Sequence, residues 1–334
     1  MPTTAQFRTT RRRALIGAVG LATAGLLAAC GGGTAGDAAG SNGSGSGSGS
    51  VAVHDVTGTV HLAKPAKRVV ALEWNYVEDL LTLGVTPVGV GDAGTYDQWV
   101  GAGKRLPKSV TDVGTRAQPS LEKIKALNPD LIVVEKSRVS ANLGQLKDIA
   151  PVVEFDGYSP NDELVRTANT SMIQLGTAVG KAAAAKQVVA RYQQKVAAAK
   201  KKLAGKATDI ALLQGFSVDG QPSIRAYTDH SQAVQVLESI GLTNAWHGKD
   251  SDPSGFTATG VEGLTQVSGA TVLYIAQPSD DPFTGALAKN ATWKNLGFVK
   301  QHKLHGIDPG TWVWGGPKSN EMLIDQALSA LGAA

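Results

Sequence analysis

Cationic and aromatic side chains recur where the strands of this sequence are expected to end. They are Trp74, Tyr76, Arg116, Lys136, Arg138, Arg225, Tyr227, Trp312 and Trp314. Arginine is a permanent cation whose forked donors suit carboxylates and other anionic oxygens, and aromatic rings supply flat apolar walls. Ligands of open α/β sheets bind beyond the carboxyl ends of the strands. Taken singly, each residue would be assigned to surface or core packing, but their shared placement predicts a ligand-binding site.

Two other motifs suggest different chemistry, and we interpret both as structural. The run 89–94 has the glycine spacing of a dinucleotide-binding fingerprint, but residues 95–107 read as a loop where that fingerprint needs a helix. His302 and His305 have a spacing seen in metal sites, yet no third ligand is nearby, and we favour a solvated turn. No spacing suggests a nucleophile elbow, a phosphate loop or a catalytic triad. We therefore expect no catalytic residues, no metal site and no cofactor.

The first thirty residues have the pattern of an export signal. Residues 1–29 hold four arginines, no acidic residue and the apolar run 14–29, which ends in a Leu-Ala-Ala-Cys sequence that resembles a bacterial lipobox. As a helix that run would reach about 24 Å, which is shorter than a bilayer core of roughly 30 Å. We predict a cleaved lipoprotein signal peptide over residues 1–29, with Sec and twin-arginine export both open. Lipidated Cys30 and a flexible Gly/Ser tether to residue 50 would then hold the protein outside the cytoplasm, at the cell membrane.

The net charge and the cysteine count exclude several classes of protein. The 334 residues carry a formal net charge of +4, and the four arginines of residues 1–29 account for all of it. The remainder is formally neutral, so the basic composition does not indicate a nucleic-acid partner. A single cysteine excludes an intrachain disulfide and any multi-cysteine metal site.

The rest of the chain alternates short strand-like runs with helical runs, a rhythm typical of parallel sheets covered by helices. Strands are expected at 68–72, 88–90, 130–134, 208–213 and 271–275, and helices at 75–83, 121–127, 181–203 and 231–240 and at the end of 312–331. The long helix 181–203 predicts two α/β lobes, 51–180 and 204–334, joined by a connecting helix. Because ligands prefer domain interfaces, we expect the cleft between the lobes to be the binding site.

The two halves share a short pattern. A Glu, two spaced apolar residues and a strand recur at a constant offset of 140 residues, as Glu122, Ile124, Leu127 and Ile132 and as Glu262, Leu264, Val267 and Val272. Helix-then-strand pairs are common, so chance similarity stays open. The repeat favours two lobes of related architecture.

Several runs resemble class III periplasmic binding proteins of the iron–siderophore and vitamin B12 type. They are 68–73, 79–89, 113–133 and the Trp-Gly-Gly-Pro of 314–317, and the Val-Gly-Thr-Arg-Ala-Gln-Pro-Ser run at 113–120 is most similar to the ferric-citrate and hydroxamate branch. The resemblance implies two α/β lobes, with mainly parallel sheets, bridged by a rigid helix. It also implies capture of a ferric siderophore and its delivery to an ABC importer, with no enzymatic activity. The siderophore itself would coordinate the iron.

The resemblance also implies roles for individual residues. Arg116 and Arg138 match ligand-binding positions of the siderophore branch, and the other residues of the predicted site align with it more loosely. Glu122 and Glu262 match the carboxylates that pair with arginines of the permease. We expect a monomer. A heme or cobalamin receptor of the same fold stays open, with Tyr76, Tyr96 or Tyr227 as an axial ligand, as does a lipid-anchored α/β enzyme.

Overall fold

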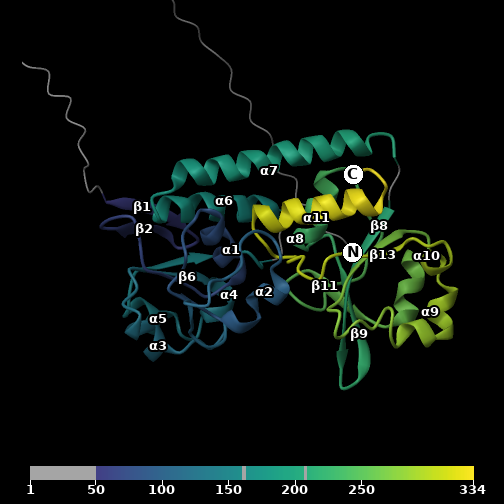
Figure 1. The fold of residues 1–334 in the computed structure, drawn as a ribbon, viewed down its shortest axis with the longest axis horizontal. Helices are drawn as coiled ribbons and strands as arrows, with labels where there is room; N and C mark the ends of the chain where they lie inside the picture. Colours follow the sequence, from purple (N-terminus) through teal and green to yellow (C-terminus); the bar gives the residue numbers. More distant parts are fainter. Residues whose placement is uncertain (1–49, 160–162, 207–208) are drawn as a thin grey trace, which may run out of the picture. The chain divides into compact units, whose positions relative to one another are not determined.

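The computed structural model describes residues 50–159, 163–206 and 209–334, and it builds two lobes, each around its own sheet (Figure 1). The predicted signal peptide, Cys30 and the tether as far as residue 49 lie outside the described residues. Within the described part of the chain, no helix is long and apolar enough to cross a bilayer. In that same part, no three His, Cys, Asp or Glu side chains are grouped so that they could hold a metal ion.

The sheet of the N-terminal lobe is parallel throughout, with strand order β5-β4-β3-β6-β7. Its strands are β3 (Val69–Ala71), β4 (Gly89–Val90), β5 (Thr111–Asp112), β6 (Leu131–Glu135) and β7 (Val152–Phe155). All residues of β3 and β6 are buried, as expected for parallel strands covered on both faces. The covering helices include α1 (Trp74–Thr82), α2 (Tyr96–Trp99), α3 (Leu121–Ala126), α4 (Lys136–Val139) and α5 (Leu143–Lys147). The hairpin β1–β2 (Val51–Asp55, Gly58–Leu62) precedes this sheet.

The sheet of the C-terminal lobe is mixed. Its order is β11-β9-β8-β12-β13, with β10 (Thr243–Asn244) beside β8. The pairs β8–β12, β12–β13 and β8–β10 are parallel, and the long hairpin β8–β9 and the strand β11 add antiparallel pairing. The bounds are β8 (Asp209–Val218), β9 (Gln221–Tyr227), β11 (Phe256–Thr259), β12 (Thr271–Ile275) and β13 (Leu304–Gly306). The helical segments here are α8 (Gln232–Ser239), η2 (Val261–Val267), η3 (Leu287–Lys289), α9 (Ala291–Asn295) and α10 (Gly297–Lys300).

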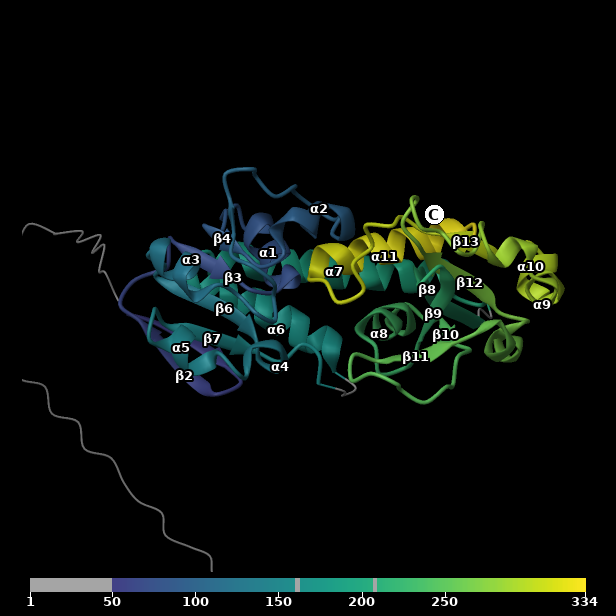
Figure 2. The ribbon, with the colours of Figure 1, turned by 90° about the horizontal axis from the view of Figure 1, so that it is seen from below.

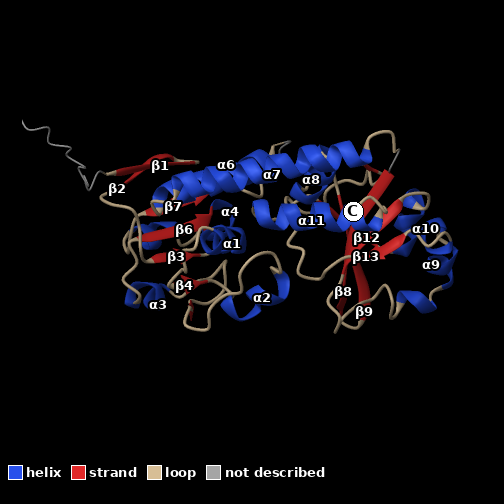
Figure 3. Ribbon diagram, turned by 45° about the horizontal axis from the view of Figure 1, so that its top comes forward, coloured by secondary structure: helices blue, strands red, loops and turns tan. Residues whose placement is uncertain are grey.

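One long helix, α7 (Ala182–Leu203), runs along both lobes, and two further helices pack against it (Figure 1). They are α6 (Leu164–Ala178) and α11 (Pro317–Ala330) (Figures 2 and 3). Gly180 separates α6 from α7 in the left-handed region (φ 71°), where glycine is least strained. The last turn of α7 carries Lys200, Lys201 and Lys202, a favourable charge for a helix C-terminus.

The predicted strands and helices are present, and their observed ends lie within a few residues of the predicted ones. The strand at Thr271–Ile275 has the predicted bounds, and α7 begins one residue after the predicted start at 181. The largest difference is β8, which continues to Val218 rather than ending at Leu213. Residues 95–107, predicted as a loop, contain the one-turn helix α2. The predicted two-lobed α/β fold is confirmed.

Candidate ligand-binding site

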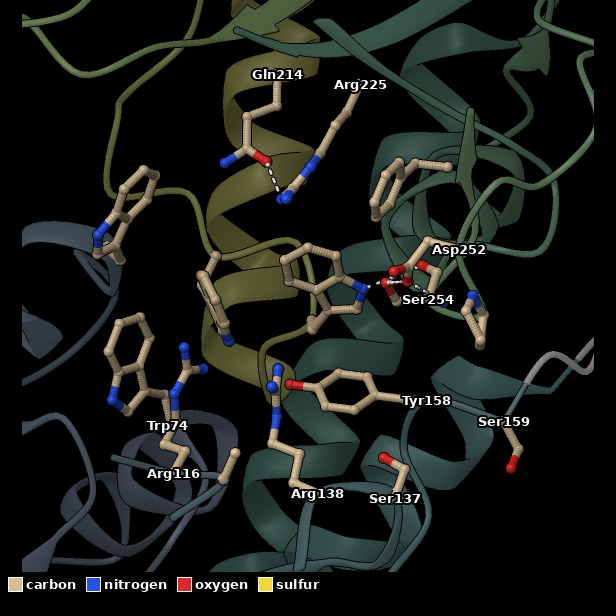
Figure 4. Close-up of a pocket in the computed structure, with 16 residues that line it drawn as sticks. Trp74, Arg116, Ser137, Arg138, Tyr158, Ser159, Gln214, Arg225, Asp252 and Ser254 are labelled. Carbon is tan, nitrogen blue, oxygen red and sulfur yellow. Dashed lines mark hydrogen bonds between the residues drawn. The ribbon is translucent and has the colours of Figure 1, made fainter. Parts of the chain in front are cut away.

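A cavity of about 780 Å³ is lined by side chains from both lobes (Figure 4). Its lining residues are Trp74, Trp99, Arg116, Ala117, Ser137, Arg138, Tyr158, Ser159, Gln214, Arg225, Asp252, Pro253, Ser254, Phe256, Trp312 and Trp314. Most of the N-terminal members follow the carboxyl ends of β3, β5, β6 and β7, the edge at which α/β sheets bind ligands. The arrangement is therefore suited to holding a molecule between the lobes.

Aromatic rings form a continuous wall across the cavity. The Trp74 ring lies 5.0 Å from that of Trp312, which lies 5.1 Å from Trp314, and Tyr158 meets Trp314 edge-on at 6.1 Å. The indole N–H of Trp74 donates to the Gly91 carbonyl (3.0 Å), which fixes the orientation of the first ring in the wall. These rings provide a preformed apolar surface with ring spacings typical of favourable aromatic pairs.

Arg116 is held at the cavity by two carboxylates of its own lobe. Its Nη1 lies 2.7 Å from Oε1 of Glu73, and its Nε lies 3.1 Å from Oδ2 of Asp92. The guanidinium lies 3.8 Å from the centre of the Trp74 ring, within the range of a cation–π contact. A Cβ on Gly91 would come within 3.1 Å of Arg116, so the absence of a side chain there allows this close approach.

Arg138 shares the same buried carboxylate. Its Nε forms an ion pair with Oε2 of Glu73, and its guanidinium lies 5.0 Å from the Tyr158 ring centre. Burial disfavours the charged form, but the Glu73 carboxylate and Tyr158 outweigh it and raise the pKa of Arg138 above its ordinary value. Glu73 is itself fully buried, and it caps α1 by accepting from the backbone N–H of Trp74 (2.9 Å).

The third cation comes from the opposite lobe. Arg225, on β9, points into the cavity from the side opposite Arg116 and Arg138 (Figure 4). Its guanidinium lies 4.5 Å from the ring centre of Phe256, and its Nη1 donates to Oε1 of Gln214 at 3.4 Å. The cavity therefore presents arginine donors from two sides and rings between them.

Comparison with known proteins gives the family. A family model described as "Periplasmic binding protein" matches residues 69–311. The chain belongs to this family. The prediction of a binding protein rather than an enzyme is thereby confirmed.

Individual relatives of this periplasmic binding protein agree with the branch that the sequence resembles. The chain is 28% identical over 280 residues to the Fe(3+)-citrate-binding protein YfmC of Bacillus subtilis, which covers 83% of the chain and 84% of the relative. It is 29% identical over 272 residues to the probable siderophore-binding lipoprotein YfiY of Bacillus subtilis, covering 78% and 80%. The crystal structure of the siderophore-binding protein FhuD from Vibrio cholerae, bound to Fe3+-Desferal, superimposes with a TM-score of 0.69 at 30% identity and covers 79% and 97%.

The cavity gathers most of the residues predicted for the site. Six of the nine line it, namely Trp74, Arg116, Arg138, Arg225, Trp312 and Trp314. Tyr76 does not, because it is fully buried and donates its hydroxyl to Oε2 of Glu135 (2.8 Å). Tyr227 is also fully buried, beneath the cavity, where it donates to Gln214 (2.8 Å). Lys136 is exposed and lies 3.9 Å from Asp156, away from the lining.

Other lining residues were missed by the sequence analysis. Trp99 stands on α2, in the segment predicted as a loop, and Phe256 stands on β11, which was not predicted. Gln214 lies just beyond the predicted end of β8. Tyr158 follows β7 in the same way that Trp74 follows β3, so the strand-end argument applies to it once β7 is recognised.

The repeated glutamates occupy equivalent places in the two lobes of this periplasmic binding protein. Glu122 lies in the first turn of α3, which Ser120 caps and which precedes β6. Glu262 lies in the first turn of η2, which precedes β12. Both side chains are exposed. The repeat found in the sequence therefore has a structural counterpart, a helical turn leading into a parallel strand.

The motifs interpreted as structural lie away from the cavity or lack the geometry for their alternative chemistry. His302 lies in the turn after α10, with φ of 56°, and His305 lies on β13, so the two do not share a helix. Gly94 lies inside a 3-10 turn (Ala93–Thr95) that leads into the four-residue helix α2, so no long α-helix begins at the glycines of 89–94.

Proposed function

We propose that this protein captures a ferric siderophore outside the cytoplasm and delivers it to an ABC importer. The observation that carries the proposal is the cavity, where three arginines from two lobes surround a wall of aromatic rings. A ferric siderophore is bulky and has an oxygen-rich rim, and its own atoms coordinate the iron. The protein therefore needs cations and apolar walls rather than metal ligands. The names of the relatives support the same ligand class.

The cavity gives less support to a heme receptor. Tyr76, Tyr96 and Tyr227 were the candidate axial ligands, and none of them lines the cavity. All three are fully buried within the fold. Tyr158 is the tyrosine that does line it, and its pKa is raised well above the ordinary value, chiefly by burial, which opposes the phenolate that would bind heme iron.

Tryptophan fluorescence provides a direct test of ligand class. Trp74, Trp99, Trp312 and Trp314 line the cavity, so a bound ferric chelate that absorbs their emission should quench it. We expect saturable quenching by at least one chelate in a panel of ferric hydroxamates, ferric citrate and ferric catecholates. If the whole panel left the fluorescence unchanged while hemin bound with a shifted Soret band, the siderophore proposal would be wrong.

A pair of variants locates the binding site. Arg138→Gln removes a cation from the cavity lining, whereas Lys136→Gln removes an exposed cation two residues away that does not line it. Because a hydrogen bond from a charged donor is worth about 1.5–3 kcal/mol, Arg138→Gln should weaken binding by about tenfold or more. Lys136→Gln should leave the dissociation constant unchanged. Equal losses in the two variants would contradict binding in this cavity.

We further propose that Glu122 and Glu262 dock the protein on the importer. Their support is their exposure, their equivalent positions in the two lobes and the family resemblance. The variants Glu122→Arg and Glu262→Arg should abolish transport of the chelate into cells while its affinity for the purified protein stays unchanged. Loss of affinity in the purified variants would refute a role confined to docking.

The proposed anchor is a lipid on Cys30. The support is the sequence pattern of residues 1–30 and the lipoprotein among the relatives. Cells that express Cys30→Ala should release the protein from the membrane fraction, and the variant should fail to incorporate a radiolabelled fatty acid. Membrane retention and labelling equal to those of the wild type would exclude this anchor.

A further inference from the structure

The charges around the cavity balance. Its lining holds three arginines and one carboxylate, on Asp252. Glu73 and Asp92 lie behind the lining. They form ion pairs with Arg116 and Arg138, the two arginines of the N-terminal lobe. The cavity and its ion-pair partners therefore count three positive and three negative formal charges, although the cations alone suggest a strongly electropositive site.

Glu73 is central to this balance because it serves two cations at once. Its Oε1 lies 2.7 Å from Nη1 of Arg116, and its Oε2 pairs with Nε of Arg138. It is fully buried, so solvent screens these pairs little. A buried ion is stable only with such partners, which means that the carboxylate and the two guanidinium groups form one unit.

The opposite side of the cavity is organised differently. Arg225 donates to the neutral side chain of Gln214, and its guanidinium lies over the rings of Phe216 (4.9 Å) and Phe256 (4.5 Å). Across the described residues, no carboxylate lies within ion-pairing distance of Arg225. Arg225 thus remains available to one anionic group or several neutral oxygens of a ligand. Arg116 and Arg138, by contrast, are already paired with carboxylates of their own lobe.

We propose that Glu73 sets the charge selectivity of the cavity. Together with Asp92 it neutralises Arg116 and Arg138, which favours ferric chelates of zero or low net charge over highly anionic ones, and it positions both guanidinium groups for neutral oxygen acceptors. Glu73 acts through the arginines, because its full burial keeps it from the ligand. This inference rests on the proposed function, and it adds the charge class of the chelate and the residue that determines it.

The test compares an uncharged chelate with an anionic one in Glu73→Gln. Glutamine keeps the size of the side chain and an oxygen to cap α1, but it removes the charge. The probes are ferrichrome, an uncharged trishydroxamate complex, and ferric enterobactin, a tricatecholate trianion. At an effective dielectric constant of about 20 and a separation of about 10 Å, Coulomb's law gives an affinity change on the order of tenfold for each unit of ligand charge.

We expect the wild type to bind ferrichrome more tightly. Because ferric enterobactin carries three negative charges and ferrichrome none, Glu73→Gln should then strengthen binding of ferric enterobactin relative to ferrichrome by on the order of a thousandfold. The control is Glu154→Gln, since Glu154 is a buried carboxylate of the same lobe that pairs with Lys147 (2.7 Å) and does not line the cavity. This control should leave the ratio of the two affinities unchanged.

Other outcomes overturn the inference. If the role of Glu73 were purely structural, Glu73→Gln would lower the affinity for both chelates by the same factor and leave the ratio of the two affinities constant. If Glu73→Gln does not fold, Asp92→Asn provides a second test, because it removes the other counter-charge of Arg116 at a partly exposed position. This variant should shift the ratio of the two affinities in the same direction. An unchanged ratio would refute the proposed charge selectivity. A wild type that binds the trianion more tightly also refutes it, whereas a wild type that binds no ferric chelate refutes the proposed function itself.

Discussion

Replacing Glu78 by glutamine is expected to remove a pH-dependent loss of stability that this carboxyl causes between about pH 4.5 and pH 7. Glu78 lies on α1, is almost fully buried, and meets the start of α11. Its Oε1 accepts from the backbone N–H of Ser319 (2.9 Å), and its Oε2 accepts from the Ser319 hydroxyl. An anion at a helix N-terminus is favourable, but here burial dominates and raises the pKa of Glu78 from 4.5 to about 7.

The sign and size of the effect follow from this raised pKa. Each tenfold change in a protonation equilibrium is worth about 1.4 kcal/mol, so the change from 4.5 to about 7 corresponds to about 3 kcal/mol. The pKa of Glu78 is higher in the folded protein than in the unfolded chain. The contribution of protonated Glu78 to the free energy of unfolding is therefore fully present below about pH 4.5 and is lost as the pH rises through 7. The neighbouring Asp79 acts in the same direction, since burial and the charge of Glu78 raise its pKa as well.

The assay is urea unfolding of the wild type and Glu78→Gln at pH 4.5, 6 and 8, followed by tryptophan fluorescence. The stability of the variant relative to the wild type should increase by about 3 kcal/mol between pH 4.5 and pH 8. An exposed glutamate provides the control, and Glu122→Gln should give a curve parallel to that of the wild type. If the curve of Glu78→Gln is also parallel to the wild type, the reasoning from burial is refuted.

Three further substitutions test side-chain packing around α1 and in the cavity. Gly316→Ala should destabilise the fold by about 1–3 kcal/mol in urea unfolding, because its Cβ would lie 2.1 Å from Oδ1 of buried Asp79, and an unchanged midpoint would contradict this packing. Tyr76→Phe should lower the free energy of unfolding by about 1–3 kcal/mol at pH 8 and by less at pH 5. Burial raises the pKa of Glu135 to about 7, and the hydrogen bond from Tyr76, which the variant lacks, stabilises the ionised form that is present above that pH. Trp314→Ala should weaken binding of any chelate that quenches the wild type, as measured by titration of the remaining tryptophans.

The elements of the fold were predictable because their signals are local. The strand 271–275 is a short apolar run, and α7 is a long segment of strong helix formers. The extension of β8 to Val218 depends instead on its pairing with β9. A prediction made from each segment separately cannot include such a contact between two segments. The hairpin β1–β2 was missed for the same reason.

The candidate site was predictable as a region but not side chain by side chain. Trp74 and Tyr76 are two apart on a helix and point to different sides, so only Trp74 reaches the cavity. Arg225 and Tyr227 are two apart on a strand, share a face and both donate to Gln214, but Arg225 lines the cavity whereas Tyr227 is fully buried. The shared carboxylate Glu73 was missed, because a charged residue directly after a strand gives no sign that it will be buried.

The aromatic wall has a consequence for the heat capacity of binding. Trp74, Trp312 and Trp314 are only 3–7% exposed because they already cover one another. Burial of apolar surface is what makes the heat capacity of association negative. The protein therefore has little apolar surface of its own left to bury, and the heat capacity change should come mainly from the surface of the ligand.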